Sequence, residues 1–401
     1  MSPRALKAGC YTLTALNTLA SQYYFNYLFF YLRDEYGFGD RTNLWVAAMH
    51  GAIYVYAAWQ GGKFAERRGY ITSLRVGYAG LLLTMVAGAW MSTAAGALVV
   101  VAAYTVALLL IWPALEALTM ADEPPERVPH RVGIYNLTWS GSAAVAYFTG
   151  GPLYEWLGPG LIFGLPAALF LVQLLMVSWL ARRMPGLPRR ADVPEPITVP
   201  AGPPAALRDR PARAAVFLRL AWMANPLSYV AVYTLLAVMP GLASRLGLSP
   251  TQVGMFCSIW FFARMLAFAL LWQWSGWHYR FRFLAGGYVL LVASFVSILV
   301  APTLVVLVLG QVVFGLATGM AYYSSLFYSM DLSDTKAEHG GLHEAAIGLG
   351  ICVGPAVGAA SLQLLPGCPG AGVVAVTGLL VCGFGAMLAV WRQAPGAADP
   401  V

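Results

Sequence analysis

Long apolar stretches separated by short polar ones follow each other along almost the whole chain. Most are roughly 20 residues long, the length that an α-helix needs to cross a hydrocarbon core about 30 Å thick. Because backbone N–H and C=O groups cannot stay unpaired in lipid, such stretches are helices rather than open strands. The strict alternation of a membrane β-barrel strand is absent from them. The pattern predicts twelve helices, at residues 8–32, 43–61, 72–92, 96–119, 132–154, 160–181, 214–240, 250–272, 283–300, 302–329, 344–365 and 371–391.

One long polar segment divides this series into six helices and six helices. It is rich in proline and arginine and has no apolar periodicity, which is typical of a flexible linker. The two sets of six also repeat each other weakly. Trp59-Gln60, near the end of the second predicted helix, matches Trp272-Gln273 in the eighth, and both pairs precede a basic connection. These repeats indicate an internal duplication.

The predicted fold class is therefore an all-α integral membrane protein with twelve transmembrane helices in two pseudo-symmetric six-helix bundles. We expect bundles at residues 1–183 and 214–392, a linker at 184–213 and a tail at 393–401.

Composition agrees with a membrane protein and the charges give its orientation. The chain is 59% hydrophobic and 10% charged, against about 25% charged residues in ordinary globular domains. The net charge of +7 does not indicate nucleic-acid binding, because the basic residues form no patch and lie in short loops. Only Arg33, Arg41 and Arg245 fall on the predicted outer connections. By the positive-inside rule, both termini and the linker face the cytosol of a plasma-membrane protein.

Residues typical of an enzyme or a cofactor site are not found. The five cysteines have no metal-type spacing, and no glycine-rich nucleotide loop is present. His339, His343 and Glu344 are interpreted as a polar segment that leads into a helix. We expect no metal, no cofactor and no enzymatic activity.

The connection GGKFAERRGY, residues 61–70, carries a resemblance to the loop between helices 2 and 3 of the major facilitator superfamily. That signature places glycines, an alanine, an acid and an arginine at fixed spacing, with a leucine further on. The residues that agree are Gly62, Ala65, Arg67, Gly69 and Leu74, with Glu66 as the acid. Phe64 stands where the signature has leucine, and Tyr70 and Ile71 replace two basic residues. The resemblance extends over the whole chain in helix number and over this loop alone in motif.

The resemblance implies a cytosolic gate between the two bundles. Glu66 would face the start of the eleventh helix, near His343 and Glu344, where a carboxylate is favoured by the helix dipole. Arg67 would pair with an acid at the end of the fourth helix, either Glu116, Asp122 or Glu123. The alternative is an ordinary positive-inside loop without a gating role. The predicted gate residues are Gly62, Glu66, Arg67, Gly69 and Glu116.

Three ionisable residues lie inside predicted helices, where a charge is costly. Arg264 is expected to face a wet cavity and to bind an anionic substrate group, or else to lock two helices as a structural pair. His50 lies close to the position that matches Arg264 in the other half, and could carry a coupling proton or simply form a hydrogen bond. Glu116 is a candidate proton carrier as well as a candidate partner of Arg67.

In the superfamily that the loop resembles, helices 1, 4, 7 and 10 line a central cavity. The polar and aromatic residues of these helices are therefore candidates to line the substrate path; they are Asn17, Gln22, Asn26, Asn225, Tyr233, Gln311, Tyr322 and Tyr323.

Glycine–proline combinations recur in the fifth and eleventh predicted helices. Small residues let helices approach closely and slide or bend. The expected packing residues are Gly150, Gly151, Pro152, Gly350, Gly354 and Pro355. The first set resembles the motif of drug/proton antiporters in the superfamily, but the arginine usual in helix 4 of those proteins is missing here.

The resulting functional prediction is a secondary transporter that moves a small organic solute by alternating access, with proton coupling left open. One alternative is proton-linked multidrug efflux. An alternative of another class is a sensor or assembly factor on the same scaffold, since WSGWHYRFRF lacks the acid and the spaced glycines. The expected partners are a small-molecule substrate, protons and the lipid bilayer around a monomer, and no nucleic acid.

Overall fold

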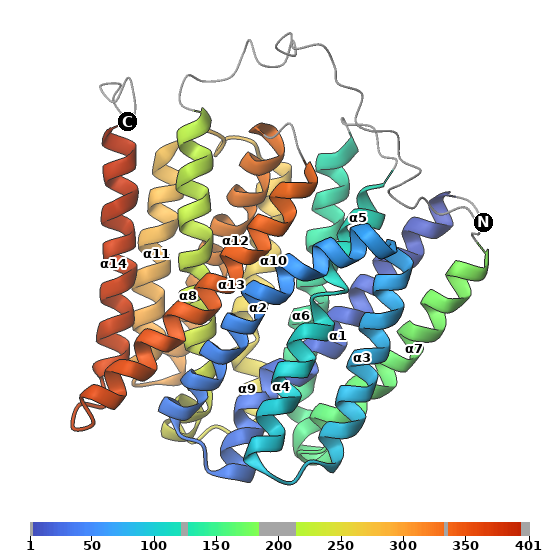
Figure 1. Ribbon diagram of the computed structural model, residues 1–401. Helices are drawn as coiled ribbons and strands as arrows, with labels where there is room; N and C mark the ends of the chain where they lie inside the picture. Colours follow the sequence, from blue (N-terminus) through green and yellow to red (C-terminus); the bar gives the residue numbers. More distant parts are fainter. Residues whose placement is uncertain (1–2, 122–126, 184–213, 333–335, 394–401) are drawn as a thin grey trace.

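A computed structural model describes residues 3–121, 127–183, 214–332 and 336–393, and this part of the chain is helical with no strand. Two of the predicted spans are each divided in two, so fourteen helices correspond to the twelve predicted spans (Figure 1). The helices are α1 (Pro3–Tyr36), α2 (Asp40–Arg68), α3 (Tyr70–Trp90), α4 (Ala94–Leu108), α5 (Trp112–Met120), α6 (Val128–Leu157), α7 (Leu161–Arg183), α8 (Ala214–Arg245), α9 (Pro250–Cys257), α10 (Ile259–Gln273), α11 (Phe281–Leu299), α12 (Leu304–Leu332), α13 (Lys336–Leu364) and α14 (Ala371–Arg392).

The two divided spans break for local reasons. Between α4 and α5, Pro113 lacks an N–H group, and its ring clashes with the carbonyl four residues earlier in a regular helix. Between α9 and α10, the Ser258 hydroxyl donates to the carbonyl of Met255 at 3.1 Å. Such a bond competes with the helical backbone ladder.

The predicted loop between the second and third spans is mostly helix. Lysine, alanine, glutamate and arginine are good helix formers, and α2 continues through them to Arg68. Gly69 then ends the helix with φ +88°, a conformation that favours glycine, and its N–H donates to the carbonyl of Ala65 at 2.9 Å. One residue therefore connects α2 to α3.

Helices α1–α7 form one bundle and α8–α14 the other, and α2 and α13 lie side by side where the bundles meet (Figure 1). The second contact between the bundles joins α6 to α9 and α10. We call the end where α7 finishes and α8 begins the linker end, and the opposite end the far end. Backbones approach closely at both contacts: a Cβ on Gly51 would lie 2.3 Å from the backbone nitrogen of Cys352.

Direct contacts join the bundles at the far end. Glu155 of α6 accepts a hydrogen bond from the backbone N–H of Thr251, at the start of α9, at 3.1 Å. The hydrogen bonds from Thr251 lower the pKa of Glu155. A Cβ on Gly241 of α8 would meet the Asp40 carboxylate of α2 at 2.2 Å. An acid thus caps a helix of the opposite bundle at the far end, as was expected of Glu66 at the linker end.

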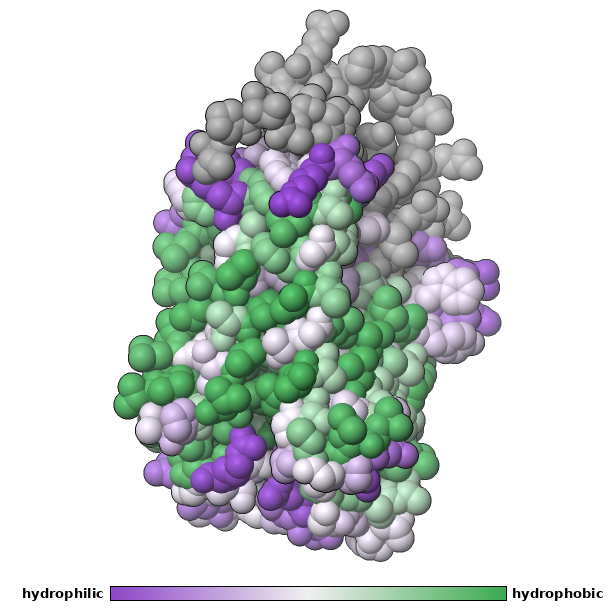
Figure 2. Space-filling view, turned by 90° about the vertical axis from the view of Figure 1, so that its left-hand side faces the viewer, coloured by the Kyte–Doolittle hydropathy of each residue, from purple (hydrophilic) through white to green (hydrophobic). Residues whose placement is uncertain are grey.

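The outer surface is that of a multi-pass membrane protein. Among the described helices, nine are long and apolar enough to cross a membrane. The others that are long enough, α1, α2 and α6, carry buried polar side chains such as Asn17, His50 and Asn136, which lower their mean hydropathy. On the face that Figure 2 shows, apolar side chains cover the middle, and hydrophilic side chains lie toward its upper and lower ends.

Candidate functional site

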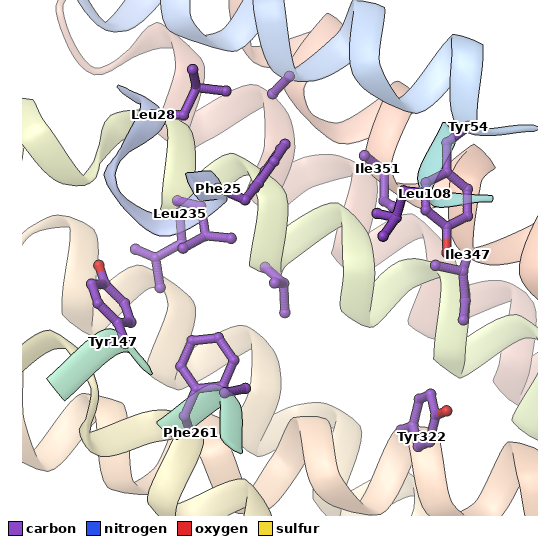
Figure 3. Packing of buried hydrophobic residues seen from close by; sticks show 14 of the residues in the cluster. Phe25, Leu28, Tyr54, Leu108, Tyr147, Leu235, Phe261, Tyr322, Ile347 and Ile351 are labelled. Carbon is purple, nitrogen blue, oxygen red and sulfur yellow. The ribbon is translucent and has the colours of Figure 1, made fainter. Parts of the chain in front are cut away.

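A cavity of about 140 Å³ lies between the two bundles. From the first bundle it is lined by residues of α1, α2, α4, α5 and α6, among them Thr18, Ser21, Gln22, Phe25, His50, Tyr54, Tyr104, Leu108, Trp112, Glu116, Tyr135 and Trp139. From the second it is lined by residues of α8, α10, α12 and α13, among them Tyr229, Tyr233, Trp260, Phe261, Arg264, Tyr322, Glu344, Ile347 and Ile351. Figure 3 shows Tyr54, Leu108, Ile347 and Ile351 gathered at one part of this lining.

Arg264 reaches the cavity from α10 and is held by aromatic rings. Its side chain is 3% exposed, and its Cζ lies 4.9 Å from the ring centre of Trp139, 5.0 Å from that of Tyr322 and 5.5 Å from that of Phe268. Its Nη2 donates to the Tyr229 hydroxyl at 3.2 Å. These four rings come from α6, α12, α10 and α8. The guanidinium is thus stabilised by π faces from both bundles.

No carboxylate of the described residues forms an ion pair with this charge. Arg264 forms no ion pair with any residue in the described part of the chain, and its Nε has no hydrogen-bond partner there. A guanidinium carries five N–H donors, so most of the hydrogen-bonding capacity of Arg264 remains for a ligand. The surroundings do not fit a structural ion pair between helices, and they leave room for an anionic or hydrogen-bond-accepting ligand.

His50 lines the cavity from the first bundle, in α2. Its Nδ1 lies 2.7 Å from the Thr105 hydroxyl, which itself donates to the carbonyl of Val101 at 2.7 Å. The hydroxyl therefore accepts from Nδ1–H, and Nε2 remains for another partner. The imidazole ring packs 4.5 Å from Phe25 and 5.7 Å from Tyr233.

Two carboxylates also face the cavity, one from each bundle. Glu116 of α5 accepts a hydrogen bond from the Tyr135 hydroxyl at 3.4 Å. Glu344 of α13 accepts one from the Tyr54 hydroxyl of α2. The start of α13 was interpreted from the sequence as a segment leading into a helix. Instead α13 begins at Lys336, which places Glu344 inside the bundle contact and 9% exposed.

Of the predicted path residues on α1, α8 and α12, only Gln22, Tyr233 and Tyr322 line the cavity. The remaining five are buried behind the lining: Asn17, Asn26, Asn225, Gln311 and Tyr323.

Helix rotation explains the difference on α1. Its lining face consists of Thr18, Ser21, Gln22 and Phe25. Asn17 directly precedes Thr18, and Asn26 directly follows Phe25. Each asparagine is therefore rotated by about 100° from its neighbour on this face. The amide atoms of both asparagines have no hydrogen-bond partner among the described residues.

The predicted gate residues lie at or near the linker end. Gly62 belongs to α2 and has open space around it, and Arg67 is exposed. Arg67 forms no ion pair with Glu116, although both lie in the described part of the chain. Side chains at the start of α13, up to residue 342, lie outside the described residues, as do Asp122 and Glu123. The gate therefore stays a prediction.

The glycines singled out from the sequence lie at close helix contacts. A Cβ on Gly151 would be 2.2 Å from the carbonyl oxygen of Pro250 in the other bundle, and one on Gly150 would meet the Tyr27 ring. On α13, Gly350 faces the carbonyl of Pro226 and Gly354 faces Val230, both on α8. Pro152 and Pro355 lie inside α6 and α13.

Sequence reasoning missed most of the aromatic lining, including Trp112, Tyr135, Trp139, Tyr229 and Trp260. In an apolar helix these residues look like ordinary packing groups. A usable signal existed on α8, where Tyr229, Val232, Tyr233 and Leu236 recur at the three- and four-residue spacing of one helix face.

These features define a polytopic α-helical membrane protein with a cavity between two bundles, in which Arg264 forms no ion pair with a described residue. No family model and no curated protein sequence matches the chain. The chain is similar in structure to the nucleoside transporter NupG, with a TM-score of 0.71 and 17% identity over 97% of this chain and 99% of that one. A structure from a study of proton-dependent oligopeptide transporters gives a TM-score of 0.71 and 15% identity, over 98% of this chain and 99% of that one. The chain therefore has the fold of the major facilitator superfamily.

Proposed function

We propose that the protein is a secondary transporter that moves a small organic solute across the cytoplasmic membrane by alternating access. The proposal rests on the position of Arg264. This intramembrane cation faces the cavity between the bundles and forms no ion pair with any described residue. Intramembrane charges are costly and typically mark a substrate or ion path. The solved structures similar to this chain are described as transporters, which supports the same class.

The lining favours a small solute with an anionic or hydrogen-bond-accepting group. Such a group would bind Arg264, while a planar part would stack on the aromatic rings. The cavity of about 140 Å³ is smaller than the roughly 300–1,000 Å³ of sites for drug-sized ligands. The proposal includes coupling to protons through acidic or imidazole groups of the lining, such as Glu116 and His50.

The proposed organisation is a monomer with bundles at residues 1–183 and 214–392, a linker at 184–213 and a tail at 393–401. The distribution of basic residues supports a cytosolic location for the linker and both termini. In this orientation the far end faces outward, and the predicted gate around Glu66 and Arg67 faces the cytosol.

A ligand screen followed by flux tests the function. A solute that binds the folded protein raises its unfolding temperature by mass action. We expect small anionic or polar planar solutes to do so, and the same solutes to enter proteoliposomes that contain the protein faster than empty liposomes. Binding without flux in folded, correctly inserted protein would favour the sensor alternative.

The native cysteine Cys368 tests the orientation. It is exposed and lies between α13 and α14 at the far end. We expect a membrane-impermeant maleimide to label it in intact cells, and the Cys368→Ser variant to lose that labelling. Labelling that requires permeabilised cells would reverse the orientation.

A further inference from the structure

Glu116 and Glu344 face one cavity from different bundles, and the contact around them joins the bundles. Glu344 belongs to the second bundle, yet its hydrogen-bond donor, Tyr54, belongs to the first. Glu116 lies four residues before α5 ends at the linker end, and Glu344 lies in the linker-end part of α13. Both side chains line the same cavity, so charges on the two acids act on each other across a low-dielectric space.

The other groups around the pair do not neutralise it. His343 holds its Nδ1 3.9 Å from Glu344, and its Nε2 lies 3.1 Å from the amide nitrogen of Asn225. When Nε2 accepts from that amide nitrogen, the ring is neutral and carries its proton on Nδ1. Arg264 packs against aromatic faces, and it forms no ion pair with either acid.

The complete set of titratable lining groups shows the same imbalance. Among the described residues, α1 contributes no titratable side chain to the lining, and α3 and α14 do not reach the cavity. Besides the two acids, the titratable lining residues are one arginine, one histidine and six tyrosines. They are His50 and Tyr54 on α2, Tyr104 on α4, Tyr135 on α6, Tyr229 and Tyr233 on α8, Arg264 on α10 and Tyr322 on α12. One fixed cation therefore faces two acids. A single bound proton makes the lining neutral.

We propose that Glu116 and Glu344 form a proton-binding site between the bundles and hold one proton between them while the linker end is closed. Two carboxylates that are both charged repel each other in a low-dielectric site, and one bound proton removes that repulsion. When the bundles separate at the linker end, the carboxylates move apart and become hydrated, and the proton leaves to water on that side. Proton binding and closure at the linker end are then the same event, so the proton is coupled to alternating access. This inference rests on the transport function proposed above.

A metal ion fits the site less well than a proton. No group of three or more histidine, cysteine, aspartate or glutamate side chains in the described part of the chain could hold a metal. Each carboxylate also accepts a hydrogen bond from a tyrosine hydroxyl, which occupies one of its oxygens. The occupant that these contacts favour is a proton.

The test measures distance at the linker end without any substrate. Spin labels on Arg182→Cys of the first bundle and Ser275→Cys of the second, both exposed, would report its opening in a background with Ser at Cys352, Cys368 and Cys382. We expect the distance between the labels to shorten as the pH falls. In Glu116→Gln/Glu344→Gln the pH-dependent step should be lost, because the amides neither repel nor titrate.

Matched variants separate this site from other acids. Glu35→Gln removes an exposed carboxylate at the far end and should leave the step unchanged. Glu116→Asp keeps a carboxylate and should retain a step with a shifted midpoint. If the double variant does not fold, Glu116→Gln alone should abolish the step, since the site needs both acids. A step that persists unchanged in a folded glutamine variant would overturn the proposal, and so would a step that follows sodium at constant pH.

Flux distinguishes failure of this site from failure of the transport function. If solute flux occurs in proteoliposomes but the distance does not respond to pH, the proton site is wrong and the transporter remains. If the distance responds to pH as expected while no solute moves, the proton site stands and the transport function fails.

Discussion

Arg264→Ala is expected to lower the initial rate of solute flux at low substrate concentration by about tenfold to hundredfold. Hydrogen bonds to a charged group contribute about 1.5–3 kcal/mol, and each 1.4 kcal/mol is roughly a factor of ten in affinity. The guanidinium has donors to spare and faces the cavity, so its loss should act on substrate binding. The measurement is flux into proteoliposomes together with the ligand-dependent shift in unfolding temperature.

The same substitution should not destabilise the protein. Removing one partner of a buried ion pair is harmful because it leaves the other charge unpaired, and Arg264 has no such partner among the described residues. We expect an unfolding temperature close to that of the wild type, because the buried charge and its ring contacts are removed together. Arg264→Lys keeps the charge but loses the planar stacking, and should recover only part of the flux.

Arg182→Ala is the matched control, because it removes an exposed arginine of α7 outside the cavity. Its flux should equal that of the wild type. Wild-type flux in Arg264→Ala would remove this residue from the transport path.

Gly151→Ala is expected to force the bundles apart at the far end. An alanine Cβ there would lie 2.2 Å from the carbonyl oxygen of Pro250 and 2.9 Å from Cα of Gly254. These are backbone atoms, so α6 and α9 must separate as helices. Overpacking of this kind costs about 1–3 kcal/mol, which shifts the population away from the far-end-closed state by roughly 5-fold to 150-fold.

A label pair at the far end measures this shift. Native Cys368 of the second bundle and Pro159→Cys of the first are both exposed there. With Cys352 and Cys382 replaced by serine, the distance between the labels should lengthen in Gly151→Ala, and flux should fall because closure at this end is part of the cycle. Gly164→Ala on α7 places a Cβ in open space and should change neither quantity. An unchanged distance in folded Gly151→Ala would mean that the contact does not hold this end closed.

The sequence was a sound guide to the helices and to the single most unusual side chain. Each span could be predicted because crossing a bilayer is a property of about 20 consecutive residues. Helix ends were harder to predict where charge and helix propensity disagree. The charged residues 63–68 were predicted as a loop, but they are good helix formers and α2 extends through them to Arg68. Arg264 could be singled out because one charge in an apolar helix is conspicuous in any context.

The site itself was only partly predictable. Hydropathy does not fix how far a helix is rotated about its axis, which is why Asn17 was predicted to line the cavity and Thr18 does so instead. The role of Glu344 depends on Tyr54, 290 residues away in the chain, and on the close packing of α2 against α13. A hydrogen bond between residues so distant in the chain cannot be predicted from a local sequence pattern.

The sequence by itself thus determined that the chain is a helical membrane protein of two repeated halves with an intramembrane arginine, since insertion into lipid is decided segment by segment. Only the tertiary structure decided which faces of the helices meet across the bundles. That choice surrounds Arg264 with aromatic rings and brings two acids to one cavity, because the contacts responsible join surfaces that are distant in the sequence.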